Sequence, residues 1–251
     1  MTKILPVIDT HAHLDELPDL DGAIKAAKEG GVLAIVAVGQ DMTSNQKTLD
    51  IAARHPGFVF PAVGYHPWRL NAAHDDETLA QMDANLVHCV ALGEVGLDYK
   101  AKTKKKVQKA LFPKILAMAK KHDKPVIVHC RYSHETAFRM AQDVGLKKAV
   151  FHWYSGPLKL IPLIAAAGYY MSACPALLYN PYHEKAIHAV PLANLLLETD
   201  TPVQYQELVA RPAHVQITLR EVARVKGLSA EEIADQTTKN ARLCFGLKRL
   251  D

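Results

Sequence analysis

The feature that most limits how this chain can fold is a repeated pair of elements, an apolar run followed by an amphipathic helical stretch. Eight such runs occur, and most are apolar over their whole length rather than at every second position. Strands with both faces buried show this pattern, which is typical of parallel sheets covered by helices. The strands we expect are Val7–Thr10, Val32–Val38, Phe58–Val63, Cys89–Gly93, Pro125–His129, Ala149–His152, Tyr169–Ala173 and Leu195–Glu198.

Helical patterns separate these strands, for example at Thr43–His55, Lys104–His122, Ser133–Asp143 and Pro157–Ala167. Eight strand–helix units in 251 residues match the size of a (β/α)8 TIM barrel, and a doubly wound open sheet is the main alternative. The sequence shows no internal repeat, low-complexity segment or linker. We therefore predict an α/β fold, a (β/α)8 TIM barrel, with residues 1–251 forming one domain.

The C-terminal stretch is predicted to be helical. Ser229 and Glu232 have the spacing of a capping box, in which each residue caps the backbone N–H of the other. Asn240 falls in the amphipathic pattern that follows, and we expect it to serve helix packing rather than chemistry.

Composition and cysteine usage suggest a cytoplasmic protein. The chain is 49% hydrophobic, 22% charged and has a net charge of +4, which permits a phosphate-bearing partner without demanding one. Its four cysteines are far apart, so we expect reduced thiols.

The N-terminus lacks a secretory pattern. The uncharged stretch 160–182 is long enough to span a bilayer, but Pro162, Gly168 and Pro175 interrupt it, which favours a buried helix, turn and strand.

Residues that can bind metal ions follow several of the apolar runs. His11 and His13 come after the first strand, and in an extended chain side chains two positions apart point to the same side. One such histidine pair is common in surface turns, but four more runs end in Glu94, His129, His152 and Asp200. In a (β/α)8 barrel all strand ends gather at one face, so these six residues would be neighbours.

Four imidazoles and two carboxylates are too many ligands for one ion and suit two. Nitrogen and oxygen donors without thiolate suit Zn, Mn or Fe, and also Mg when water completes the shell. The predicted cofactors are therefore two divalent metal ions, with Mg, Zn or Mn as the candidates.

Motifs along nearly the whole chain show a resemblance to a known family. The chain resembles the TatD family of metal-dependent deoxyribonucleases, which belong to the wider group of amidohydrolase-like barrels. The motifs that carry the resemblance are Asp9-Thr-His-Ala-His-Leu-Asp15, Gly64-Tyr-His-Pro67, Gly93-Glu-Val-Gly-Leu-Asp98, Lys124-Pro-Val-Ile-Val-His129, His152-Trp-Tyr-Ser-Gly156, Glu198-Thr-Asp-Thr-Pro202 and Thr238-Lys-Asn240.

The resemblance implies a two-metal site. In it His11, His13 and Asp200 would hold one ion, His129 and His152 the other, and Glu94 would bridge them. Two segments depart from the family pattern and lie where substrate would rest. The chain has His152-Trp153-Tyr154 where the family usually has His-Cys-Phe, and Arg211-Pro-Ala-His214 where Arg-Asn-Glu-Pro is common.

The predicted activity is hydrolysis of DNA phosphodiester bonds by an exonuclease that acts on single-stranded or frayed ends. The two ions would activate water and neutralise charge on the phosphoryl oxygens. Asp200 and Glu94 are the predicted catalytic residues, and Asp200 would orient that water and accept its proton. DNA is the expected partner and RNA a further candidate, while no membrane or protein partner is indicated.

Two other functions remain open on the sequence. One is a different amidohydrolase-type barrel hydrolase, such as a lactonase, amidase or deaminase. Those relatives often bridge their metals with a carboxylated lysine, whereas the bridging position here is Glu94. The other, from another class, is a non-catalytic metal-binding scaffold.

The candidate substrate-binding residues are His66, Arg131 and Tyr154. His66 and Arg131 follow strands and could engage a phosphate, which a guanidinium matches with two hydrogen bonds. Tyr154 could stack on a base. Asp98 and Glu198 are expected to orient ligating histidines. A run of lysines from Lys100 to Lys109 could contact a polyanion backbone or could simply be a solvated helix start.

Overall fold

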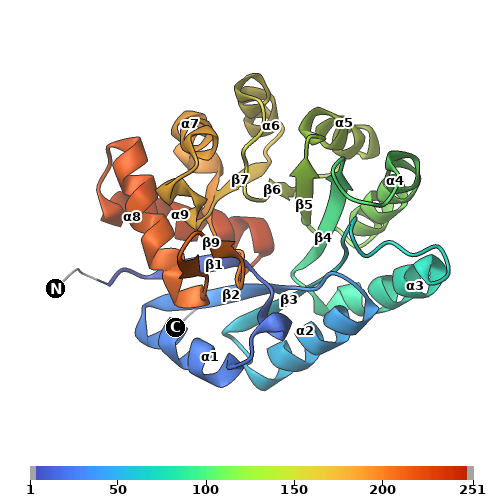
Figure 1. The fold of residues 1–251 in the computed structure, drawn as a ribbon, viewed down its shortest axis with the longest axis horizontal. Coiled ribbons are helices and arrows are strands. Elements are labelled where there is room, and N and C mark those ends of the chain that lie inside the picture. The colour runs from blue at the N-terminus through green and yellow to red at the C-terminus, as the bar shows by residue number, and fades with distance from the viewer. Residues whose placement is uncertain (1–3, 248–251) are drawn as a thin grey trace.

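The computed structural model describes residues 4–247, and its centre is an eight-stranded parallel sheet. The strands pair in chain order from β1 to β8, and an isolated parallel bridge between Ala12 and Thr201 links the two edges. The sheet is thus a nearly closed barrel with helices around it, and the predicted (β/α)8 TIM barrel is confirmed (Figure 1). The strands are β1 Val7–Ala12, β2 Val32–Val38, β3 Val59–Tyr65, β4 Ala91–Asp98, β5 Val126–Arg131, β6 Ala149–Phe151, β7 Tyr170–Ala173 and β8 Leu195–Leu197.

Helices connect consecutive strands and cover the outside of the barrel (Figure 1). The helices that the sequence predicted are present with ends shifted by a few residues, and a 3-10 turn precedes α6. The α-helices are α1 Leu20–Glu29, α2 Met42–Arg54, α3 Asp75–Asn85, α4 Lys105–Lys121, α5 His134–Val144, α6 Ile161–Ala166, α7 Pro181–Ala189, α8 Val215–Lys226 and α9 Ala230–Phe245. A short hairpin, β9 Gln204–Tyr205 and β10 Leu208–Val209, follows β8.

Apolar side chains fill both faces of the barrel sheet. One buried cluster combines alternate strand positions, among them Ile8, Ile127, Val150 and Leu196, with Phe245 at the end of α9. The larger buried cluster contains the strand residues at the intervening positions, and their side chains pack against the helices. Burial on both faces explains why the strand segments do not alternate between apolar and polar residues.

The uncharged stretch 160–182 folds as the predicted helix, turn and strand. Helix α6 ends at Ala166, Gly168 has φ = +74°, and β7 follows. A positive φ is accessible to glycine at little cost, so this residue can end the helix and reverse the chain. Within residues 4–247, no helix has the length and apolarity that crossing a membrane requires.

The capping box that opens α9 is present as predicted. The Ser229 hydroxyl accepts a hydrogen bond from the Glu232 amide, and the Glu232 carboxylate accepts one from the Ser229 amide. Further along the helix, the buried Asn240 side chain donates to the carbonyls of Leu192 and Leu195, each at 2.8 Å. Asn240 therefore attaches α9 to the start of β8, which agrees with the packing role predicted for it.

Candidate metal centre

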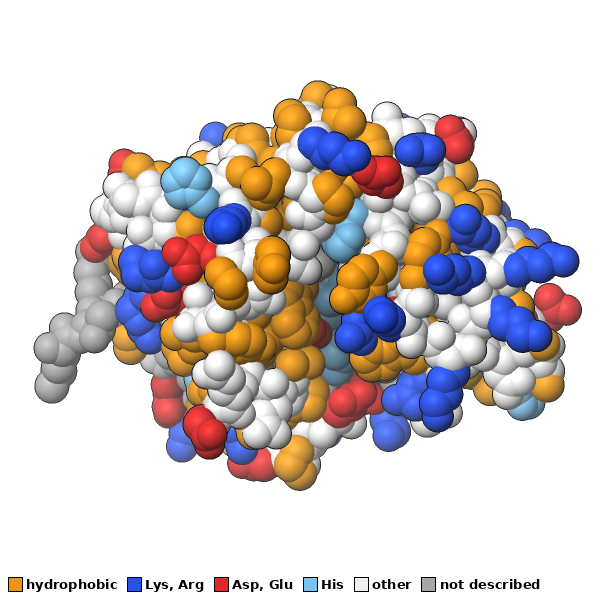
Figure 2. All heavy atoms as spheres, turned by 45° about the horizontal axis from the view of Figure 1, so that its top comes forward, with side chains coloured by type: hydrophobic (Ala, Val, Ile, Leu, Met, Phe, Trp, Pro, Cys, Tyr) orange, Lys and Arg blue, Asp and Glu red, His pale blue; other side chains and the backbone are white. Residues whose placement is uncertain are grey.

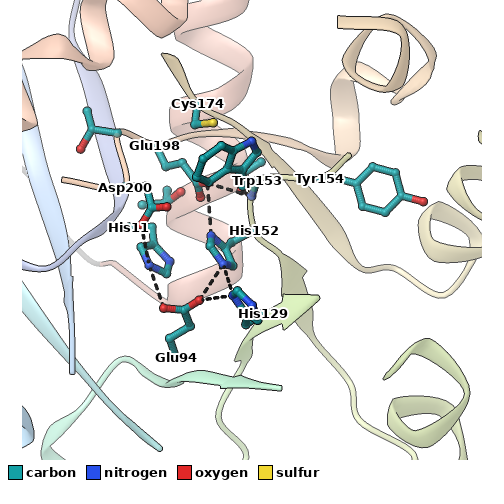
Figure 3. Close-up of polar contacts among 12 residues, drawn as sticks. His11, Glu94, His129, His152, Trp153, Tyr154, Cys174, Glu198 and Asp200 are labelled. Atoms are coloured by element: carbon teal, nitrogen blue, oxygen red, sulfur yellow. Dashed lines mark hydrogen bonds and ion pairs between the residues drawn. The ribbon is translucent and has the colours of Figure 1, made fainter. Parts of the chain in front are cut away.

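The six residues predicted to bind metal lie together at the carboxyl-terminal end of the barrel, and Figure 3 labels all of them except His13. Two of them point into the barrel because each lies two positions after an interior residue, and side chains two apart along a strand share a face. His129 follows the interior residue Ile127 on β5, and His152 follows Val150 on β6. Glu94 differs from the sequence prediction in one respect. It lies inside β4, which continues to Asp98, rather than at the strand end.

Four donor atoms form a first group. They are His11 Nε2, His13 Nε2, Glu94 Oε2 and Asp200 Oδ1. His11 Nε2 is 3.2 Å from His13 Nε2 and 3.4 Å from Asp200 Oδ1. Glu94 Oε2 is 3.6 Å from His11 Nε2 and 3.4 Å from His13 Nε2. Separations of 3.2 to 3.6 Å are those of ligand pairs that share one cation through bonds of about 2.1 Å, the usual distance of zinc from nitrogen and oxygen ligands.

The other oxygen of Glu94 faces a second group of donors. Glu94 Oε1 is 2.8 Å from His129 Nδ1 and 2.7 Å from His152 Nε2. These two nitrogens are 3.4 Å apart. One buried carboxylate thus presents an oxygen to each group of imidazoles (Figure 3).

Hydrogen bonds on the far side of two imidazoles determine which nitrogen faces the donor groups. His13 Nδ1 donates to the Val38 carbonyl at 2.9 Å, which leaves Nε2 with its lone pair. His129 has the opposite arrangement, because its Nε2 is 3.2 Å from Asp98 Oδ2 and Nδ1 faces Glu94. Such outer contacts fix the tautomer and orientation of a metal-binding histidine.

Glu198 lies behind both groups. Its Oε1 accepts a hydrogen bond from the Trp153 amide at 2.8 Å and is 3.5 Å from His152 Nδ1. Ligand atoms of Glu198, His11 and His152 lie within 4.8 Å of one another. Glu198 therefore lies beside His152, and His11 Nδ1, His152 Nδ1 and Glu198 Oε2 are buried without a hydrogen-bond partner in residues 4–247.

Neighbouring side chains lower the pKa of two carboxylates in the centre. Burial alone would raise the pKa of Glu94, but the charge of the His152 imidazole and hydrogen bonds from His11 and His129 hold this pKa well below its usual range. Burial would likewise raise the pKa of Asp98, but hydrogen bonds from His129 and Trp68 lower it. Both carboxylates are therefore ionised at neutral pH, as acceptors for cations must be.

His66 is buried beside Glu94 but differs from the other imidazoles. Its Nδ1 accepts a hydrogen bond from the Trp68 amide at 3.2 Å, so the proton sits on Nε2, 3.5 Å from Glu94 Oε1. Burial lowers the pKa of His66 to about 4, which keeps the ring neutral at pH 7. A neutral Nε2–H can donate to an anion but offers no lone pair to a metal.

A cavity of about 730 Å³ opens above these residues. Its walls include His66, Arg131 and Asp200, together with two residues that the sequence analysis missed, Gln40 and Trp68. Both could have been found by position, since each closely follows the end of a strand, β2 or β3. In Figure 2 histidine side chains are visible in the hollow, with Lys and Arg side chains gathered to one side of it.

The prediction that Tyr154 stacks on a base is wrong, because the structure buries this side chain. Its side chain is 0% exposed, its hydroxyl donates to the Pro157 carbonyl at 2.9 Å, and its ring packs edge-on against His134. Figure 3 shows the ring pointing away from the cluster of histidines and carboxylates. Because neither face of the ring is exposed, Tyr154 is a core residue in this structure.

The lysine run does not line the cavity. Lys105 and Lys109 lie over the ring of Tyr99, and Lys100 lies over the ring of Tyr132. The run therefore covers the loop after β4 and the first turns of α4, beside the cavity rather than inside it.

The donor atoms suit divalent cations. All of them are imidazole nitrogens or carboxylate oxygens. In residues 4–247 no cysteine belongs to a candidate metal-binding group. Such a set favours Zn, Mn or Mg over metals that require thiolate.

Comparison with known proteins gives consistent matches over nearly the whole chain. The TatD related DNase family matches residues 8–246. Deoxyribonuclease TATDN3 of Homo sapiens is 30% identical over 95% of this chain and 94% of its own length. The 3'-5' ssDNA/RNA exonuclease TatD of Erwinia tasmaniensis is 29% identical over 91% and 94% of the two chains. The crystal structure of the TatD homologue YJJV from Escherichia coli K12 superposes with a TM-score of 0.90, at 28% identity and 97% and 99% coverage.

Proposed function

Because the chain belongs to the TatD family and is thus a metal-dependent hydrolase of ester bonds, we propose that it hydrolyses DNA as an exonuclease acting on single-stranded ends. The observation that carries the proposal is the placement of Glu94. Its two oxygens face separate groups of donors at the base of an open cavity. Two cations held about one carboxylate suit a substrate whose reacting group is an anionic phosphodiester.

In this proposal His11, His13 and Asp200 would hold one divalent ion, His129 and His152 the other, and Glu94 would bridge them. The ions would supply Lewis acidity and positive charge beside the reacting phosphate. Asp98 and Glu198 keep the ligating imidazoles in position.

The remaining roles belong to side chains that face the cavity. Asp200 orients the attacking water and accepts its proton. Its backbone contributes to this placement, because the Asp200 amide donates to the His11 carbonyl and so ties the loop after β8 to β1. The neutral His66 donates its Nε2–H to a phosphoryl oxygen. Arg131, exposed at the rim, pairs with the phosphate through its guanidinium.

We further propose that RNA is a secondary substrate and that the protein works in the cytoplasm. The four cysteines are free, and three of them are buried, which suits a reducing compartment. The relative from Erwinia tasmaniensis is named for activity on both single-stranded DNA and RNA.

Asp200→Asn tests the proposed chemistry. The amide keeps the size of the side chain but cannot accept the proton, so turnover of labelled single-stranded DNA should fall by about 10² to 10⁴. Folding should survive, since residues at this end of a barrel contribute little to its core. Circular dichroism and the thermal midpoint provide the control. A folded Asp200→Asn protein with wild-type turnover would remove this residue from the mechanism.

The same assay separates the competing functions. Wild-type protein supplied with Mg, Mn or Zn is tested in parallel on single-stranded DNA, lactones and amides. Hydrolysis of lactones or amides alone would favour the other amidohydrolase-type chemistry, and turnover of none of them would favour a metal-binding scaffold.

A further inference from the structure

Exposed aromatic side chains are concentrated at one face of the molecule. Within residues 4–247 the exposed aromatic side chains are Trp68, Tyr132, Tyr179 and Tyr182, with exposed fractions of 57%, 70%, 38% and 75%. Each lies in a segment that follows the carboxyl end of a barrel strand, β3, β5 or β7. Large aromatic rings are usually buried, so their exposure around the metal centre indicates a surface that contacts a ligand.

Two of these rings line a second cavity that adjoins the metal centre. This cavity has a volume of about 970 Å³ and lies between the starts of α5 and α7 and the loop after β6. Tyr132 and Tyr182 are among its lining residues. Arg131, Ser155 and Asn180 line both this cavity and the one above the metal ligands. The two cavities therefore form one groove, with Arg131 at the junction.

The backbone holds the ring of Tyr132 outward. Tyr132 has φ = +58°, a left-handed conformation that is unfavourable for a bulky side chain. Conformations of this kind persist where the surrounding structure imposes them, and they are concentrated at ligand-binding sites. The ammonium of Lys100 lies 5.2 Å from the centre of the Tyr132 ring and adds positive charge beside it.

The second cavity is also suited to an anion. Arg131 and Lys185 line it, and neither forms a salt bridge with another residue in the described part of the chain. Its acidic lining residue, Glu135, is neutralised by Lys159 at 2.7 Å and Arg139 at 3.7 Å. The charge left facing the cavity is therefore positive.

We propose that the second cavity binds the nucleotides that flank the scissile phosphate in a single-stranded polynucleotide. The inference rests on the proposed function and adds the path of the strand to it. The chain of the substrate runs from the metal centre past Arg131, its bases stack on Tyr132 and Tyr182, and a phosphate pairs with Lys185. Exposed aromatic rings in a positively charged groove are the surface that single strands use, because only an unpaired base has a free face to stack.

Binding measured without catalysis tests this path. Fluorescence anisotropy of a labelled oligothymidylate of about eight nucleotides is recorded in EDTA, where hydrolysis cannot occur. Tyr132→Ala and Tyr182→Ala should each weaken binding on the order of tenfold, as is usual when a stacking ring is lost. Tyr132→Phe and Tyr182→Phe keep the ring and should bind as the wild type does. Lys185→Ala should weaken binding and reduce its dependence on salt.

Matched controls come from exposed residues that line neither cavity. Leu163→Ala and Lys25→Ala remove an exposed apolar side chain and an exposed lysine on α6 and α1, and both should bind as the wild type does. Wild-type affinity in both Tyr→Ala variants would overturn the inference. So would equal losses in the controls, or a blunt duplex bound as tightly as the single strand. Hydrolysis of the same oligonucleotide with metal ions is assayed separately. A strand that binds as described but is never cut would contradict the proposed function and leave the path supported.

Discussion

At the scale of single residues, the carboxylate of Glu94 connects the two halves of the candidate centre. Its oxygens lie 2.7 Å from His152 Nε2 and 3.4 Å from His13 Nε2, on opposite sides of one side chain. A buried carboxylate with imidazoles on both sides can bind two cations without a further anionic ligand between them. Loss of its charge should therefore affect both ions, whereas loss of one imidazole should affect mainly one.

Glu94→Gln and His129→Ala test this difference. Glu94→Gln should lower the occupancy of both ions, because the neutral amide is a poor bridge, while His129→Ala should mainly empty the second group. Metal content per chain is measured by elemental analysis of the purified proteins. Glu16→Gln is the matched control, since Glu16 lines the same cavity but is exposed and belongs to neither donor group. Two full ions in Glu94→Gln would show that this residue is not the bridge.

At the scale of elements, α9 supports the strand that leads to Asp200. Asn240 donates to the carbonyl of Leu195, the first residue of β8, and to that of Leu192 in the turn before it, and its own Oδ1 accepts from Gln236 at 2.7 Å. The predicted role of Asn240 depended on the periodicity of the helix, which the sequence shows directly. Its two acceptors could not be predicted, because they belong to a segment about 45 to 48 positions away.

Asn240→Ala should lower the free energy of unfolding by about 1 to 3 kcal/mol, because the buried carbonyl of Leu195 and the partly buried carbonyl of Leu192 lose their donor. Urea unfolding followed by circular dichroism measures the change. Arg242→Ala, at an exposed position of the same helix, should change the value by less than about 0.5 kcal/mol. Equal stability of Asn240→Ala and Arg242→Ala would mean that α9 is held to β8 by apolar packing alone.

At the scale of the whole molecule, the barrel brings four imidazoles and two carboxylates together from β1, β4, β5 and the segments after β1, β6 and β8, and all but His129 are buried. An unfolded chain would hold these residues far apart. Metal ions that bind only the folded cluster therefore add to its stability, by about 4 kcal/mol at a thousandfold excess over the dissociation constant.

Chelation should consequently lower the thermal midpoint of the wild-type protein by roughly 10 °C, since about 1 kcal/mol shifts the midpoint of a chain of this size by 2 to 4 °C. Differential scanning calorimetry with and without EDTA measures the shift. Glu94→Gln, which should bind the ions poorly, is expected to show little response to EDTA. An unchanged wild-type midpoint after verified removal of the metal would mean that the ions do not stabilise the barrel.

The sequence by itself determined the fold class and the identity of the candidate donors. Both follow from local patterns, because a strand buried on two faces must be apolar throughout and a side chain at its end must lie at the barrel face.

Only the tertiary structure decided how those side chains are turned. His129 presents Nδ1 to Glu94 whereas His13 presents Nε2, since their outer partners, Asp98 and Val38, come from different strands. In the same way neighbouring loops bury Tyr154 and leave Tyr132 exposed, although both tyrosines follow barrel strands. Rotation and burial depend on contacts between distant segments, such as Asp9 with Thr199 at a separation of 190 positions, and no local pattern encodes them.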